Sequence, residues 1–107
     1  MSRESFAVSV QGKRIRLTAE RWSHIGSRHP ELRGLRDEVL RAIDNPRLVV
    51  KGKHDEIIAV RPMVNRPTIS VIVVYRESGK DGFIITAYLT SDIRELERRE
   101  KLWPSLS

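Results

Sequence analysis

The sequence predicts an α+β fold in which N-terminal helices pack on a mostly antiparallel four-stranded sheet, with a hairpin before the helices and a further helix at the C-terminal end. Helix-type spacing of apolar residues is confined to residues 18–45 and to the stretch after residue 90, whereas β-branched apolar segments fill the region between them. Turn-rich spacers join those segments, as in an antiparallel meander. Because 107 residues suffice for one hydrophobic core and not for two, we expect a single domain over residues 1–107.

The first elements are predicted from turn and capping residues. Two short apolar segments, residues 6–10 and 14–17, flank a glycine turn, which predicts an edge hairpin. Thr18 is a good N-cap for the first helix. That helix should end at His29, because the residue before a proline is disfavoured in the helical conformation, and Pro30 can then open the second helix.

The second helix, ended before Pro46, has an apolar stripe opposite a charged stripe and should lie on the surface of the core. Four strands rich in β-branched residues should follow: residues 48–50, 57–60, 69–74 and 83–89. The third of these, up to Tyr75, is almost entirely apolar on both faces, so it should be the central strand. The last helix should open at Ser91 and run through Leu96 towards Trp103.

The charge balance favours a polyanionic partner. The chain carries 20 Lys and Arg against 14 Asp and Glu, a formal net charge of +6, with a pI near 10.3. Such a charge favours RNA, DNA, an acidic protein or a membrane surface. Without cysteine there is neither a disulfide framework nor a thiolate metal site. The sequence has neither a signal-peptide pattern nor an apolar run of membrane-spanning length, so we expect a cytoplasmic protein with no membrane partner.

Chemically useful side chains recur on the first helix and on the last strand. Arg21, His24 and Arg28 are three and four residues apart, so they should project from one helix face. Alternation along the strand places Thr86 and Tyr88 together, opposite a face that should be buried: Phe83, Ile85, Ala87 and Leu89. Imidazoles transfer protons near neutral pH and guanidiniums bind phosphate. Each feature also has a structural explanation, since a histidine often packs at a core border and strands favour Thr and Tyr.

Additional basic residues lie in and around the first strands of the predicted meander. The sequence does not decide which basic residue would face the side chains of the first helix and the last strand. The four candidates are Lys51, Lys53, His54 and Arg61. A mobile basic loop is the alternative explanation for residues 51–55. The sequence has no metal-ligand spacing, no pair of carboxylates suited to glycoside hydrolysis and no glycine-rich phosphate loop. We therefore expect neither a metal site nor a cofactor.

Several motifs, spread over about residues 14–90, together resemble the phage-type members of the barnase, EndoU, colicin and RelE-like ribonuclease superfamily: Leu17–Thr18, Glu20–Trp22, His24–Ile25, Arg28–Pro30, Glu38–Val39, Ile43, Asn45–Pro46, Ile69–Val74 and Gly82–Tyr88. The resemblance implies N-terminal helices on a four-stranded antiparallel sheet. It also implies a metal-independent, toxin-like endoribonuclease. In the implied reaction, a ribose 2′-OH attacks the adjacent phosphate and leaves a 2′,3′-cyclic phosphate.

The resemblance also implies roles for individual residues. His24 would be the general base or acid, and Arg28 would clamp the phosphate. Thr86 and Tyr88 would orient the substrate with their hydroxyls. Substrate binding would involve four further residues: Arg21, His29, Lys51 and Arg61.

RNA is therefore the expected partner, together with an acidic antitoxin or immunity protein that would restrain a free nuclease. The main alternative is a non-catalytic module of the same fold that binds RNA or another protein. A third hypothesis is a DNA-binding domain.

Overall fold

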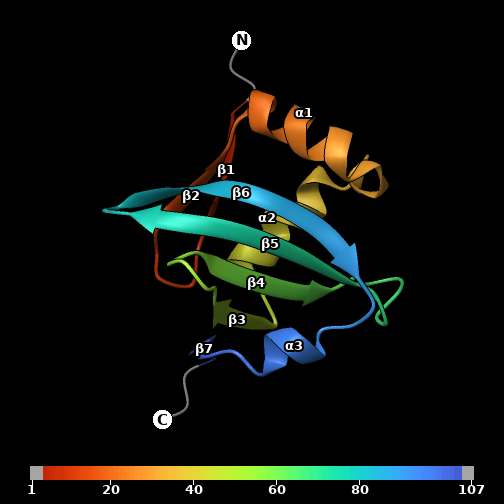
Figure 1. Ribbon diagram of the computed structural model, residues 1–107. Coiled ribbons are helices and arrows are strands. Elements are labelled where there is room, and N and C mark those ends of the chain that lie inside the picture. The colour runs from red at the N-terminus through yellow and green to blue at the C-terminus, as the bar shows by residue number, and fades with distance from the viewer. Residues whose placement is uncertain (1–3, 105–107) are drawn as a thin grey trace.

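The computed structural model describes residues 4–104 and folds them around one seven-stranded mixed sheet with helices on both faces (Figure 1). The ends of the predicted domain, residues 1–3 and 105–107, lie outside the described residues. In chain order the elements are β1 (Ser5–Val8), β2 (Arg14–Leu17), α1 (Ala19–Arg28), the 3-10 turn η1 (Pro30–Leu32), α2 (Arg36–Asp44), β3 (Leu48–Lys51), β4 (Ile57–Pro62), β5 (Ser70–Ser78), β6 (Asp81–Thr90), α3 (Arg94–Glu97) and β7 (Lys101–Trp103). The strand order is β1-β2-β6-β5-β4-β3-β7.

The predicted four-stranded, mostly antiparallel sheet is wrong. The N-terminal hairpin does not stand apart from the meander, because β2 pairs in parallel with the beginning of β6, residues 14–16 against residues 81–83. At the opposite edge, β7 pairs with β3. Both additions join segments that are far apart in the chain. A local apolar pattern indicates that a segment is a strand but not which distant strand it pairs with.

The C-terminal helix is also shorter than predicted. α3 has only four residues and begins after Ile93 rather than at Ser91. The carboxylate of Asp92 accepts a hydrogen bond from the backbone N–H of Arg94 at 3.0 Å, in the turn that precedes α3. Residues 101–103 then form β7 rather than helix, and this strand pairs with backbone groups of β3 that would otherwise form an open sheet edge.

The predicted limits of the first helix are confirmed. Thr18 Oγ1 accepts a hydrogen bond from the backbone N–H of Arg21 at 3.0 Å, and α1 ends immediately before His29. The second predicted helix is interrupted, because Pro30 opens only the short turn η1. Gly34 lies between η1 and α2 at a φ of +78°, a left-handed conformation that a helix cannot continue through and that glycine adopts without strain.

Alternate residues of the strands face two different apolar layers. α1, η1 and α2 pack on one face, to which β5 contributes Val71, Val73 and Tyr75; we call it the helix face. The opposite face is covered in part by Leu96 of α3, which packs near Ile72 of β5; we call it the α3 face. In Figure 1, α2 lies behind β4 and β5. The position of β5 between β4 and β6, in the middle of the sheet, confirms the predicted central strand.

A β-bulge changes which residues of β6 are buried. The register between β5 and β6 shifts after Val74, so Ile85 has no partner directly opposite it. Alternation is therefore interrupted, and Ile84 is buried on the helix face while Phe83 turns to the other face and is 44% exposed. The predicted apolar face is thus wrong at its first residue. Beyond the bulge it is confirmed, because Ala87 packs in the helix-face core.

Candidate functional site

The candidate site lies along the edge of β6 that follows its pairing with β2. That pairing ends at Phe83, and within the described residues α1 and η1, rather than another strand, pack beside the remainder of β6 (Figure 1). The guanidinium of Arg21 donates a long hydrogen bond, 3.4 Å from Nη1 to oxygen, to the backbone carbonyl of Ile85. Helix α1 therefore protects a strand edge and brings its own polar residues beside it.

Two of the sequence-predicted residues meet at the end of α1. The ring centroids of His29 and Tyr88 lie 6.1 Å apart, with their planes tilted by 35°. On its other side, His29 Nδ1 lies 3.4 Å from Oε2 of Glu31, which follows it across a single proline. The His29 side chain is one-third exposed, so this imidazole lies between the protein and solvent. An imidazole, a carboxylate and a phenol are thus grouped at the surface.

The phenol of Tyr88 lies on the α3 face, where it packs partly against the apolar cluster under α3. Burial raises the pKa of Tyr88 above its ordinary value, the negative charge of Glu95 raises it further, and the positive charge of Arg99 opposes both. Arg99 also donates two hydrogen bonds to the Glu95 carboxylate, at 3.2 and 2.7 Å. A tyrosine phenol is a hydrogen-bond donor at neutral pH, and the raised pKa of Tyr88 does not change this.

The sequence analysis did not single out three residues around His29 and Tyr88: Glu31, Glu95 and Arg99. Glu31 had a local signal, since an acid two positions after a histidine can reach back to its ring. Glu95 and Arg99 had none, because their relation to Tyr88 depends on how α3 returns to the sheet.

His24 and Arg28 both lie exposed on α1. His24 borders a shallow open hollow of about 420 Å³, together with three other residues: Thr18, Glu20 and Arg21. Thr86 pairs with Val74 and so shares the α3 face with Tyr88, as the strand alternation predicted. That His24 or Arg28 acts together with those hydroxyls stays a prediction.

The basic residues of the middle strands are not brought to this site. Arg61 follows Ala59 on the helix face of β4, and Lys51 follows Val49 on the same face of β3, whereas Tyr88 lies on the opposite face. The guanidinium of Arg61 donates a hydrogen bond of 2.7 Å from Nη1 to the carbonyl of Asn45, the C-cap of α2. Arg61 thus has a structural role at a helix end. The nearby loop residues Lys53 and His54 are exposed.

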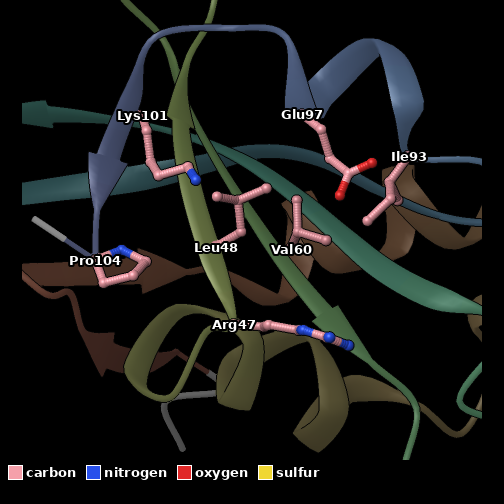
Figure 2. Close-up of a pocket in the computed structure, with 7 residues that line it drawn as sticks. All are labelled: Arg47, Leu48, Val60, Ile93, Glu97, Lys101 and Pro104. Carbon is pink, nitrogen blue, oxygen red and sulfur yellow. The ribbon is translucent and has the colours of Figure 1, made fainter. Parts of the chain in front are cut away.

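A separate pocket of about 460 Å³ opens on the α3 face (Figure 2). Leu48 and Val60 form its apolar base, and its other lining residues are Arg47, Ile93, Glu97, Lys101 and Pro104. None of the residues predicted as a site from the sequence lines it. We therefore distinguish it from the candidate site at the β6 edge.

Between residues 4 and 104, no group of three or more His, Cys, Asp or Glu side chains is arranged to hold a metal ion. The helices described in that range include none that is long and apolar enough to cross a membrane. Comparisons with protein-family models, with curated proteins and with solved structures find no match to this chain, so its function has to be argued from the site itself.

Proposed function

We propose that this protein cleaves RNA without a metal ion, and that His29 and Tyr88 carry the proton transfers. The proposal is supported by the grouping of an imidazole, a carboxylate and a phenol at one end of β6. The rings of His29 and Tyr88 are 6.1 Å apart, and Glu31 lies 3.4 Å from the imidazole. RNA cleavage through the ribose 2′-OH requires both a base and an acid, and this group offers both.

His29 is the proposed general base. When Nδ1–H faces the carboxylate of Glu31, Nε2 is left free to take the proton of the 2′-OH. The 2′-oxygen then attacks phosphorus, and the bond from phosphorus to the 5′-oxygen breaks. The Glu31 carboxylate holds the ring in the orientation in which it receives the proton.

Tyr88 is the proposed general acid. A tyrosine phenol is protonated at neutral pH, and the raised pKa of Tyr88 keeps it so; a departing 5′-alkoxide is more basic than a phenolate, so the proton passes to the 5′-oxygen. The products are a 2′,3′-cyclic phosphate and a 5′-hydroxyl, and solvent restores the protons. Arg28, next to His29 on α1, is the proposed phosphate clamp. This assignment transfers the acid–base role from His24 to His29.

The test is cleavage of several single-stranded RNAs by the purified protein in the presence of EDTA. We expect 2′,3′-cyclic phosphate ends. Replacing His29 by Ala should lower the cleavage rate by about 10²- to 10⁴-fold, the range for loss of a general base. Tyr88→Phe, which keeps the ring and removes only the hydroxyl, should also lower it. His24→Ala is the matched control, because it removes an exposed imidazole from α1, the helix that His29 follows.

Thermal unfolding of each variant separates a catalytic loss from a folding defect. A wild-type protein that cleaves none of the RNAs would exclude the nuclease. If His24→Ala abolishes cleavage while His29→Ala does not, the chemistry belongs to His24 and the proposed assignment is wrong.

A further inference from the structure

Both phenylalanines of the chain lie at the surface. Phe6 is 52% exposed and Phe83 is 44% exposed, although phenylalanine is among the residues most often buried. Val8, in the same strand as Phe6, is 48% exposed. Among the described residues, only one other large apolar side chain is exposed in this way. It is Val64, in the β4–β5 connection.

The strand register places the two rings in one row with two arginines. Phe6 of β1 pairs with Arg16 of β2, Arg16 pairs with Phe83 of β6, and Phe83 pairs with Arg76 of β5. Cross-strand partners have their side chains on the same face of a sheet, so aromatic and guanidinium groups alternate across four strands. We call these four residues the Phe–Arg row. The guanidinium of Arg14 adds a further cation, 4.7 Å from the centre of the Phe6 ring.

The Phe–Arg row lies on the α3 face but outside the area that α3 covers. The apolar cluster under α3 is built from β3, β4, β5 and the end of β6, whereas β1 and β2 contribute nothing to it in the described chain. The charges on this part of the face are mainly positive. Asp81 is the acidic residue in register with Arg14, and the guanidinium of Arg76 also donates to the carbonyl of His54 at 3.0 Å.

We propose that the Phe–Arg row binds single-stranded RNA, with bases stacked on Phe6 and Phe83 and phosphates neutralised by Arg14 and Arg16. Alternating aromatic rings and cations match the alternating bases and phosphates of a single strand, and stacking needs no particular base. A second copy of this chain is a poorer fit, because a two-fold contact through this face would bring arginines against arginines.

The proposal rests on the proposed function for its choice of RNA, and it adds a binding surface to it. Phe83 and Tyr88 lie on the same face of the same strand. At about 3.4 Å per residue, the five steps between them span about 17 Å. A strand stacked on Phe83 could therefore continue along β6 to the candidate catalytic group.

The test measures binding of a fluorescently labelled oligouridine by anisotropy, in the His29→Ala protein so that cleavage does not interfere. Phe6→Leu and Phe83→Leu remove each ring but keep apolar bulk. Each should weaken binding by about five-fold or more, the effect of losing one stacked base. Val64→Ala is the matched control, since it truncates a still more exposed apolar residue elsewhere, and it should leave the affinity unchanged.

Unchanged affinity in both phenylalanine variants would overturn the proposal. So would a change from dimer to monomer on gel filtration in Phe6→Leu with RNA binding intact, because the row would then be a contact between copies. If binding depends on the two rings while the wild-type protein fails to cleave RNA, the surface stands and only the nuclease is lost. If the protein cleaves RNA but binds it independently of the rings, only the surface is lost.

Discussion

Replacing Arg61 by Met tests whether this residue acts on α2 or on RNA. Its Nη1 donates to the carbonyl of Asn45, the C-cap of α2, at 2.7 Å. Carbonyl groups at a helix C-terminus carry partial negative charge, so a guanidinium there is stabilising. Methionine keeps an unbranched apolar side chain and removes the charge and the hydrogen bond.

The expected magnitude follows from three contributions. A hydrogen bond from a charged donor contributes about 1.5–3 kcal/mol, and the interaction with the helix end contributes about 0.3–1 kcal/mol. Within the described residues, however, Arg61 Nε is buried without a hydrogen-bond partner, and removing it recovers about 1–3 kcal/mol. Asn45 is exposed, so water can hydrate its carbonyl in the variant. The balance is a loss of stability of about 1 kcal/mol.

Thermal unfolding followed by circular dichroism measures this loss. For a domain of this size, about 1 kcal/mol corresponds to a Tm lower by roughly 4–8 °C. Arg33→Met is the matched control at an exposed position after η1, where the change should stay within about 0.5 kcal/mol. RNA affinity should be the same in both variants. An unchanged Tm together with weaker RNA binding by the Arg61 variant would refute the capping argument.

Three further predictions concern close packing, acid stability and salt. Gly82→Ala should destabilise the protein by about 1–3 kcal/mol in urea unfolding, because a Cβ at this position would collide with the backbone carbonyl of Arg76; an unchanged midpoint would contradict this close approach. The hydrogen bonds from Arg94 hold the pKa of Asp92 well below its usual range. The stability that this carboxylate contributes is therefore fully present above the unfolded pKa of about 3.9 and is lost as the pH falls below it. Asp92→Asn should lose less stability on acidification than the wild type does. The logarithm of the RNA affinity should fall linearly with the logarithm of the salt concentration, and Arg16→Gln should reduce that slope by about 0.7, whereas an unchanged slope would remove Arg16 from the phosphate contacts.

Local chemistry along the chain determined where several elements begin and end. Thr18 caps α1, and Pro30 ends it, because both effects depend only on neighbouring residues. Residues 69–75 are apolar on both faces, and this was enough to identify the middle strand. A strand buries apolar side chains on both faces only when both faces of the sheet are covered at that place.

The proposed catalytic group shares residues with the site predicted from the sequence but gives them other roles. His29 and Tyr88 were both singled out, but His29 was expected to bind the substrate while His24 did the chemistry. Helical spacing says which side chains share a face of α1, yet it does not say how that helix is rotated against β6. The contacts of Arg21 with Ile85 and of His29 with Tyr88 decide the rotation, and they arise from packing between segments about sixty residues apart in the chain.

The sequence by itself therefore determined the limits of α1 and the positions of most strands, while the tertiary structure decided the strands' partners and exposed faces, the short α3 and the strand β7. The parallel pairing of β2 with β6, the bulge at Ile85 that turns Phe83 outwards, and the use of Arg61 as a helix cap leave no local signature. Such features are selected by how much apolar surface the whole chain buries and by which distant backbone groups find hydrogen-bond partners, and these quantities exist only once the chain has folded.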